Sequence, residues 1–463
     1  MRFKQVTLEN FRHVQSLEVT LHERLTVLVA PNGQGKTTLL DALAVLMGPF
    51  VGAFDMGKRH GRHIQHSDAR YQGQAEGAEL EQQYPVRIGA LVSGLVGHDT
   101  EVSVVRELTG PRSRTTIKGA APLANHGNDL MARVRAFEPV TLPLVSYYGT
   151  GRLWKTHKNL KRKAVLSASR TLGYEDCLTS VSNYFQLQDW VGKATMALFQ
   201  ERSRDQDIRS RDQDNIERLQ DQLGSVAEAV DRVMEPRGWS GFHYSLVHEE
   251  LAMRQEGQGV LPLSHLSDGV RTMVSMVADM AWRCAKLNPH LGKEAAAQTP
   301  GVVLIDEVDL HLHPEWQQQV VQSLRAAFPQ VQFIVTTHSP QVLTTVPREC
   351  IRQLGTEWDD EQKTWRATAT EPDFQTEGVA SADTLARIMN INPIPDVAPA
   401  RQLAAYRQAI EEGRQDEPEA KTLRDELLRH FGEKHPEMLE CERLQRFQEM
   451  KRRMKAKETG SDA

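Results

Sequence analysis

Five side chains that can bind metals or exchange protons lie within eight residues of the sequence: Asp306, Glu307, Asp309, His311 and His313. The apolar stretch 301–305 before them predicts a strand, and α/β sheets bind ligands at the ends of such strands. Asp306 there suits Mg²⁺ coordination, and Glu307 suits polarising an attacking water. A histidine metal site would need both imidazoles on one face. Pro314 favours a helix that begins directly after them, so we expect both histidines to pack and hydrogen-bond in a loop.

A glycine-rich turn in the sequence has the residues of a phosphate-binding loop. The segment APNGQGKTT at 30–38 follows a strand-like stretch and opens an apolar helix, which is the context that such a loop needs. Ala30 replaces the first glycine of the pattern, which matters only if that position needs a positive φ. Lys36 would neutralise the β- and γ-phosphates, and Thr37 would offer its hydroxyl to Mg²⁺. The residues expected to contact ATP here are Asn32, Gly33, Gln34, Gly35, Lys36, Thr37 and Thr38.

Two further segments fit the same chemistry. LSDGVR at 266–271 opens a helix, where Ser267, Gly269 and the free N–H groups can bind an anion. Alone, this segment fits an ordinary N-capped helix equally well. Its place about 40 residues before the 301–305 strand favours the nucleotide-binding interpretation. His338 ends the next predicted strand, where it can donate a hydrogen bond to a γ-phosphate.

The surrounding sequence predicts an α/β fold with a mixed or parallel sheet, flanking helices, a helical insertion and a helical C-terminal region. Apolar periodicity and turn residues predict these elements in chain order: strands within 3–30, a helix from about 36 to 47, a loop over 50–84, strands within 85–108 and 140–154, helices over 175–235, a strand pair within 241–255, a helix from about 267, a strand–helix–strand unit over 301–339, a hairpin over 350–370 and helices from 381. We therefore expect four regions: an N-terminal lobe at 1–174, a helical arm at 175–240, a C-terminal lobe at 241–380 and a helical, partner-docking region at 381–463.

Composition narrows the class of protein. The chain has 463 residues, of which 40% are hydrophobic and 25% are charged, so it can bury a sizeable core. A net charge of −5 gives no global sign of nucleic-acid binding. The four cysteines have no CxxC spacing, which favours reduced thiols in a cytoplasmic protein. Neither a signal-like start nor a run of 18 apolar residues is present, so we expect no membrane segment.

Taken together, the motifs and their order resemble the ABC-type ATPase head, and the opening LENFRHVQSLEVTL resembles its RecF, SMC and OLD branch. The resemblance implies that two heads sandwich two ATP molecules head to tail, so that each site is shared between chains. It also implies that Asp309 belongs to the loop after the catalytic strand and that Arg12 lies near the nucleotide. Gln65 is the candidate for the glutamine that reaches the metal.

Four other pieces resemble the ATPase subunits of the Septu anti-phage system, which are related to the ATPases of some retrons: YYGTGRLW at 147–154, GYEDCL at 173–178, IDEVDLHLHP at 305–314 and SADTLARIMN at 381–390. This resemblance implies an ATP- and Mg²⁺-dependent regulatory subunit that controls a separate HNH endonuclease. Nucleic acid would then be contacted through the complex. Two alternatives are a RecF-like repair ATPase that binds DNA directly and an OLD-like chain with its own nuclease activity. The chain after His338 is too short and helical for such a nuclease domain. This disfavours the alternative of an OLD-like chain with its own nuclease activity.

Two segments outside these motifs also lead to expectations. The basic stretch 151–163, with Trp154, could stack on nucleic acid or form a solvated or partner-binding loop. In the C-terminal region, four residues at helical spacing form one apolar face: Leu423, Leu427, Leu428 and Phe431. Such a face must be buried, and we expect it to pack on the ATPase head or on a partner.

Overall fold

The computed structural model describes these residues: 1–55, 57, 61–72, 80–98, 100–151, 169–180, 184–202, 213–360 and 364–459. The basic stretch 151–163 lies outside this part of the chain except for its first residue. The chain forms two compact units, Met1–Met389 and Asn390–Ala463. The first unit holds every nucleotide motif found in the sequence. The expected borders at residues 174 and 240 both fall inside it, and they remain predictions.

A six-stranded sheet forms the centre of the first unit, in the order β15-β14-β3-β13-β12-β8. All neighbours are parallel except β15, which pairs antiparallel with β14. The strands are β3 (Leu25–Val29), β8 (Leu144–Tyr148), β12 (Gly301–Ile305), β13 (Val331–Thr336), β14 (Ile351–Asp359) and β15 (Thr364–Thr370). Every residue of β3, β8, β12 and β13 is buried, as expected for parallel strands covered on both faces.

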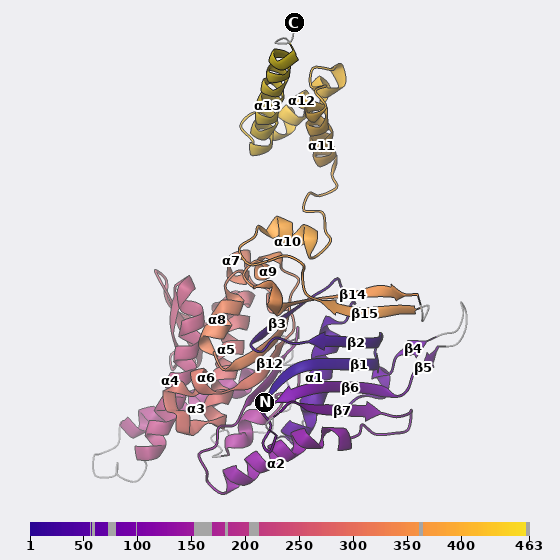
Figure 1. Ribbon diagram of the computed structural model, residues 1–463. Coiled ribbons are helices and arrows are strands. Elements are labelled where there is room, and N and C mark those ends of the chain that lie inside the picture. Colours follow the sequence, from indigo (N-terminus) through magenta and orange to yellow (C-terminus); the bar gives the residue numbers. More distant parts are fainter. Residues whose placement is uncertain are drawn as a thin grey trace. The chain divides into compact units, whose positions relative to one another are not determined.

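Two hydrophobic cores lie on opposite faces of this sheet. One core holds α3 (Tyr184–Arg202), α4 (Gln213–Met234), α5 (Asp268–Leu287) and α8 (Val320–Ala327). The other holds α1 (Lys36–Gly52), α2 (Ala121–Arg135) and an antiparallel sheet of β1 (Arg2–Phe11), β2 (Val14–Thr20), β6 (Val86–Ser93) and β7 (Val102–Leu108). Figure 1 shows these two groups of elements on either side of the central strands.

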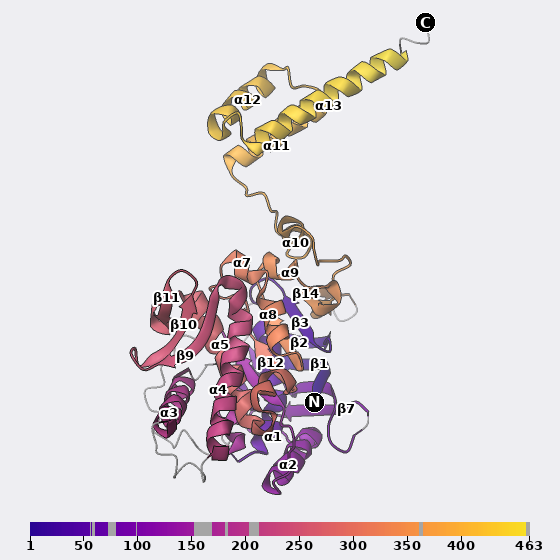
Figure 2. The same ribbon diagram turned by 90° about the vertical axis from the view of Figure 1, so that its left-hand side faces the viewer.

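Smaller elements complete the first unit. A three-stranded sheet of β9 (Trp239–Ser245), β10 (Glu250–Gln255) and β11 (Gly259–Pro262) lies beside α3 and α5 (Figure 2). The short strands and α-helices are β4 (Tyr71–Gln72), β5 (Glu81–Gln82), α6 (Ala295–Gln298), α7 (Pro314–Gln317), α9 (Pro340–Leu343) and α10 (Ser381–Arg387). The 3-10 helices are η1 (His66–Asp68), η2 (Lys118–Ala120), η3 (Arg170–Tyr174), η5 (Glu235–Arg237), η6 (Leu263–His265), η7 (Pro289–Glu294) and η8 (Arg348–Cys350).

The α/β class, the strand–helix–strand unit, the 350–370 hairpin and the helical C-terminal region are confirmed. The first helix is longer than expected. It continues through Pro49 to Gly52 because its second half is also buried in the core. Gly48 allows this packing, since a Cβ there would lie 2.6 Å from the backbone oxygen of Arg62.

The second unit contains α11 (Ala398–Glu411), α12 (Pro418–Phe431) and α13 (Pro436–Thr459). Its own core includes Tyr406, Ile410, Leu427 and Cys441. The apolar face of α12 packs into this core, with Leu427 buried and Leu423, Leu428 and Phe431 partly buried around it. The expectation that this face is buried on the head or on a partner is therefore wrong. Helices α11 and α13 of the C-terminal unit cover this face instead, and sequence periodicity cannot identify which surface covers it.

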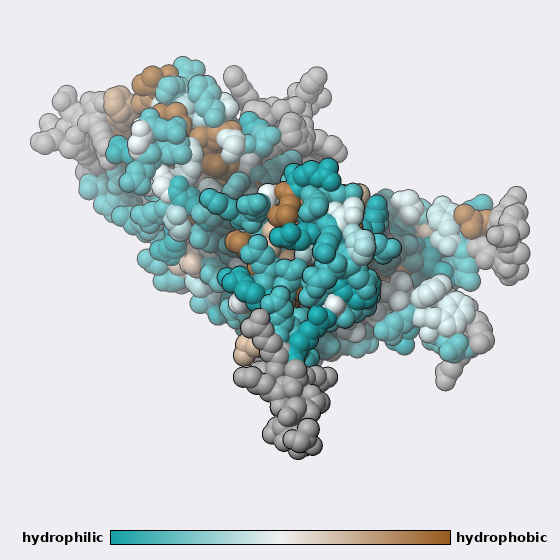
Figure 3. Space-filling view, turned by 90° about the horizontal axis from the view of Figure 1, so that it is seen from above, coloured by the Kyte–Doolittle hydropathy of each residue, from teal (hydrophilic) through white to brown (hydrophobic). Residues whose placement is uncertain are grey.

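Helices of the described residues are nowhere long and apolar enough to cross a membrane. All four cysteines are buried free thiols. The surface seen in Figure 3 is mostly hydrophilic, and its apolar residues gather in small patches.

Candidate nucleotide-binding site

The phosphate-binding loop connects the end of β3 to the beginning of α1. Gly33 and Gly35 have φ angles of 81° and 95°, which only glycine adopts at low cost. Gly35 is the N-cap of α1, so the free N–H groups of the first helical turn face the loop. Ala30 is not among the positive-φ residues, so the alanine that replaces glycine there causes no backbone strain.

Lys36 lies across this loop. Its Nζ donates hydrogen bonds to the backbone oxygens of Ala30, at 2.7 Å, and Pro31, at 3.1 Å. Burial lowers the pKa of Lys36, while Asp306, Glu307 and Asp309 act in the opposite direction. The ammonium group is therefore held inside the loop and faces a cluster of carboxylates.

The end of β12 contacts the loop directly. Thr37 Oγ1 donates a hydrogen bond to Asp306 Oδ2 at 2.8 Å, and Thr336 Oγ1 donates to Asp306 Oδ1 at 2.7 Å. The backbone N–H of Glu307 donates to Thr336 Oγ1 at 2.7 Å. The parallel pairing of β12 with β13 brings Thr336 to this position. Both carboxylate oxygens of Asp306 are thus oriented by hydroxyl groups from two other elements.

The backbone after Asp306 turns sharply. Glu307 has a φ of 49° and His311 a φ of 61°, conformations that are uncommon for residues other than glycine. Observed backbone strain of this kind gathers at functional sites. Asp309 Oδ1 accepts a hydrogen bond from Thr337 Oγ1 at 2.5 Å, which ties the turn to the end of β13.

A cavity of about 270 Å³ lies at the junction of these elements. It is lined by His13, Asn32, Gly33, Gly35, Lys36, Thr37, Thr38, Asp306, Glu307 and His338. The structure therefore brings together nine residues that the sequence predicts for the nucleotide site. His13 is a lining residue that the sequence motifs do not predict. No local motif identifies His13, because this residue reaches the cavity only when the turn between β1 and β2 packs against α1.

Five expected site residues lie outside this cavity in the described structure: Arg12, Gln34, Gln65, Ser267 and Gly269. Ser267 is the N-cap of α5. A Cβ on Gly269 would lie 2.3 Å from the backbone oxygen of His311, so the beginning of α5 packs closely on the strained turn after β12. Close approach of the backbone, not a left-handed conformation, requires glycine at this position.

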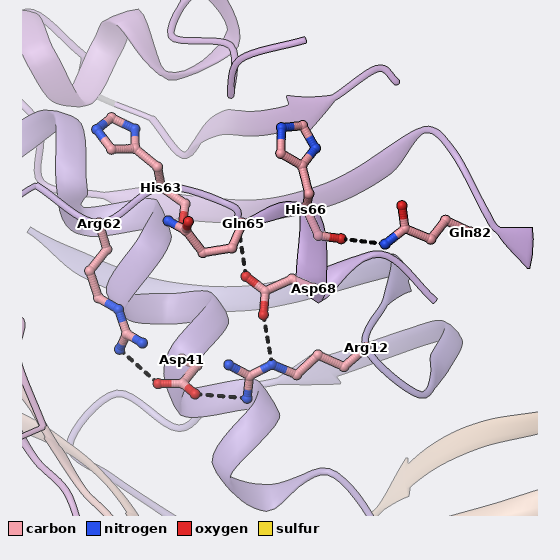
Figure 4. Close-up of polar contacts among 8 residues, drawn as sticks. All are labelled: Arg12, Asp41, Arg62, His63, Gln65, His66, Asp68 and Gln82. Carbon is pink, nitrogen blue, oxygen red and sulfur yellow. Dashed lines mark hydrogen bonds and ion pairs between the residues drawn. The ribbon is translucent and has the colours of Figure 1, made fainter. Parts of the chain in front are cut away.

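Arg12 is part of a charged network beside the cavity (Figure 4). Its guanidinium contacts Asp41 Oδ2 of α1 at 2.8 Å and Asp68 Oδ1 of η1 at 2.9 Å. Arg62 contacts the other oxygen of Asp41 at 2.7 Å. The two carboxylates together raise the pKa of Arg12, although burial alone would lower it. Arg12 thus fastens the β1–β2 turn to both α1 and the segment after it.

Gln65 lies at the far end of the same network. Its backbone N–H donates to Asp68 Oδ2 at 2.9 Å, and its side-chain amide donates to the backbone oxygen of His63 at 3.3 Å. Gln65 does not line the cavity within the described chain. Its role as a metal ligand remains a prediction.

His311 and His313 lie in the loop between β12 and α7. His313 is the N-cap of α7, which begins at Pro314 as expected, and its Nδ1 accepts from the backbone N–H of Glu315. No group of three or more histidine, cysteine or acidic side chains within the described residues could hold a metal ion.

A buried ion pair connects α5 to the central sheet. Arg283 Nε contacts Asp279 Oδ2 at 2.8 Å, and Tyr148 at the end of β8 donates to the same oxygen at 2.6 Å. Arg283 also donates to the backbone oxygens of Gly173 and Glu175, at 2.8 and 2.9 Å. The segments YYGTG and GYEDCL therefore meet at one helix.

Comparison with known proteins gives two family models. Residues 5–230 match a model described as an AAA domain. Residues 180–344 match a model described as AAA domain, putative AbiEii toxin, Type IV TA system. The two matches together cover all the nucleotide motifs.

Individual proteins are similar to the chain over different shares of its length. The retron Vc95 probable ATPase of Vibrio cholerae serotype O1 biovar El Tor is 23% identical over 93% of this chain and 88% of that protein. The Septu protein PtuA of Bacillus mycoides is 41% identical over 17% of this chain and 10% of that protein. The SMC head domain from Thermotoga maritima has a TM-score of 0.40 and 16% identity, over 80% of this chain and all of that one. The chain therefore has P-loop ATPase domains, and its homologues include retron ATPases and the Septu protein PtuA.

Proposed function

We propose that the cavity at the phosphate-binding loop binds ATP with Mg²⁺ and hydrolyses it. The observation that carries this proposal is the 2.8 Å hydrogen bond between Thr37 and Asp306, which lie 269 residues apart in the sequence. A hydroxyl and a carboxylate are oxygen ligands of the kind that Mg²⁺ takes, so these two residues fit the ion. When bound, Mg²⁺ neutralises charge that develops on the phosphates.

The other lining residues have distinct roles in this proposal. The backbone of Asn32, Gly33 and Gly35 cradles the phosphates, and Lys36 neutralises them. Glu307 polarises the attacking water, and His338 donates a hydrogen bond to the γ-phosphate.

We further propose that a second copy of the chain completes the site. The cavity holds the loop and strand ends of one chain, whereas Ser267 and Gly269 begin a helix outside it. In a head-to-tail homodimer, the α5 N-terminus of one chain would face the γ-phosphate bound by the other. Larger assemblies would then be built from such dimers. This arrangement makes hydrolysis depend on dimerisation.

The biological role that we propose is a cytoplasmic regulatory subunit of an anti-phage defence complex. The similarity to Septu protein PtuA and to retron ATPases supports this role. ATP-dependent dimerisation would control a separate HNH endonuclease, and the complex would contact nucleic acid. A RecF-like repair ATPase is the second candidate, because one relative at 49% identity over 43 residues is a RecF protein of Chlorobium luteolum.

Co-purification tests this role. The chain should retain an HNH protein encoded beside it, and ATP should change the DNA cleavage rate of the complex. The complex with Lys36→Ala should lose this response to ATP. Two results contradict the proposal: metal-dependent cleavage by the isolated chain, or specific DNA binding by it with a steep dependence on salt.

The C-terminal unit is the proposed docking region for the partner. A cut before Arg414 would open the core that α11, α12 and α13 share, so a cut after Met389 is the cleaner test. The chain 1–389 should bind ATP with unchanged affinity and fail to retain the nuclease. Retention of the nuclease would place the docking surface on the first unit.

A further inference from the structure

One face of helix α13 packs inside the C-terminal unit. Cys441 is buried in the core of that unit. Further along the helix, Gln445 Nε2 donates a hydrogen bond to Tyr406 Oη of α11 at 2.9 Å, and Arg452 donates to the backbone oxygen of Gly413. These contacts determine which side of α13 faces the rest of the unit.

The opposite face of α13 carries exposed apolar side chains. Leu439, Phe447 and Met450 are 43%, 63% and 59% exposed, and together they form the α13 stripe. At about 100° per residue, the three lie within about 80° of the helix circumference, roughly opposite Cys441 and Gln445. Figure 2 shows α13 continuing past the ends of α11 and α12, so these helices leave its later turns uncovered. Large apolar side chains grouped on an exposed face mark an interaction site.

Basic residues surround the α13 stripe. At helical spacing, Arg443 lies within its arc, and Arg446 and Lys451 lie on either side of it. Arg443 and Arg446 contact carboxylates one turn earlier on the same helix, at 3.3 and 4.0 Å. Exposed pairs of this kind contribute little, so both guanidinium groups can exchange them for another anion. The segment 443–457 has seven lysines and arginines and one glutamate, so this part of the helix is strongly cationic.

The charge around the α13 stripe selects what can cover it. A second copy of α13 would bring the same cations against the stripe, and like charges in an interface repel each other. The phosphates of a nucleic acid would match the cations but would leave the apolar side chains in water. A protein groove with an apolar floor and carboxylates along its rim matches both features, in the manner of an amphipathic helix bound in a groove.

We infer that the α13 stripe docks a protein partner through an apolar groove that is rimmed by carboxylates. This inference rests on the proposed function, in which the C-terminal unit docks the nuclease, and it adds the face of the unit and the chemistry of the partner surface. Phe447 is the anchor of the contact, because it is the largest side chain of the stripe and aromatic residues dominate the energy of interfaces. The flanking cations fix the orientation of the helix in the groove.

The affinity of the full-length chain for the HNH nuclease encoded beside it, with ATP and Mg²⁺ present, tests the apolar part of the contact. The double variant Phe447→Glu with Met450→Glu should weaken binding at least about tenfold, in the range for loss of an interface anchor. Its melting temperature should be unchanged, because both side chains are exposed. Phe137→Glu, at an exposed phenylalanine of the first unit, is the matched control and should bind the nuclease like the wild type.

A second double variant, Arg446→Glu with Lys451→Glu, tests the charged part. It should also weaken nuclease binding, and its affinity should depend less steeply on salt than that of the wild type. Lys421→Glu with Arg424→Glu makes the same change of net charge at exposed positions of α12. This control should stay within about threefold of the wild-type affinity, since charges away from the contact are largely screened.

Three results would overturn the inference. The first is wild-type nuclease affinity in the Phe447 and Met450 variant. The second is dissociation of the ATP-bound homodimer by that variant, which would make a second copy the occupant of the stripe. The third is unchanged nuclease affinity with lost nucleic-acid binding in the Arg446 and Lys451 variant, which would assign the cations to phosphates. Failure of the proposed function looks different: either the wild-type chain would not bind the nuclease, or the chain 1–389 would retain it.

Discussion

Thr37 and Asp306 are joined by a 2.8 Å hydrogen bond between the first turn of α1 and the end of β12. This bond brings the hydroxyl of the phosphate-binding loop to the carboxylate at the end of β12. It predicts that the Thr37 oxygen, and not the shape of its side chain, matters for hydrolysis.

Thr37→Val should therefore lower the ATP hydrolysis rate at least about tenfold, which corresponds to about 1.4 kcal/mol of transition-state stabilisation. Thr37→Ser keeps the hydroxyl and should stay within about threefold of the wild type. Steady-state phosphate release over a range of Mg²⁺ concentrations measures both. Equal activity of the valine and serine variants would show that the hydroxyl has no role.

Glu307→Gln keeps the size of the side chain and removes the carboxylate that we propose polarises the attacking water. We expect hydrolysis to fall roughly 10²–10⁴-fold, the range for loss of general-base catalysis. ATP affinity should be unchanged, so the ATP-bound dimer should accumulate in size-exclusion chromatography with light scattering. Glu315→Gln, at an exposed carboxylate on α7, is the matched control. Wild-type turnover in Glu307→Gln would assign the base to another residue.

The buried pair of Arg283 and Asp279 should be important for stability. Arg283→Met leaves the Asp279 carboxylate buried without its cation, which costs about 3–5 kcal/mol of the free energy of unfolding. Lys193→Met removes an exposed pair at the same helical spacing, with Asp189, and should cost about 0.3–0.5 kcal/mol. Urea denaturation measures both values. A cost below about 1 kcal/mol for Arg283→Met would show that the carboxylate is solvated or protonated.

His126 predicts a pH dependence of stability. Burial lowers its pKa from 6.5 to about 4, and its Nδ1 accepts from the backbone N–H of Val96. The unfolded chain takes up a proton below pH 6.5 and the folded chain only near pH 4, so the free energy of unfolding falls between these values. His126→Gln should reduce the fall between pH 7 and pH 5 by about 2 kcal/mol. The exposed His98→Gln should leave it unchanged. Equal slopes for His126→Gln and the wild type would contradict the shift.

Short sequence motifs were sufficient to predict much of the candidate nucleotide site. Gly35, Lys36 and Asp306 could be predicted because each belongs to a motif in which a few adjacent residues define both the element and the chemistry. The partners of Arg12 could not be predicted, because Asp41 and Asp68 lie on two other elements and meet it only after the β1–β2 turn packs on α1. The same long-range packing places His13 in the cavity.

The C-terminal face shows a different limit. Helical spacing predicted that Leu427 is buried, and it is. Helical spacing does not indicate which surface covers the apolar face of α12. The sequence therefore could not identify α11 and α13 as the helices that cover it. The end of α1 was misplaced for a similar reason, since tertiary burial carries the helix past Pro49.

ATP hydrolysis at a site shared between two chains is the central proposal, and a mixing experiment tests it directly. Lys36→Ala removes from one chain the cation that we propose binds the phosphates, and Ser267→Arg blocks the start of α5 in another. Each variant alone should hydrolyse ATP at under about a tenth of the wild-type rate, since every composite site in its homodimer is damaged. An equal mixture should form heterodimers with one intact site, and its activity per chain should exceed that of either variant several-fold. Additive activity in a mixture whose heterodimers have been demonstrated would contradict the shared site.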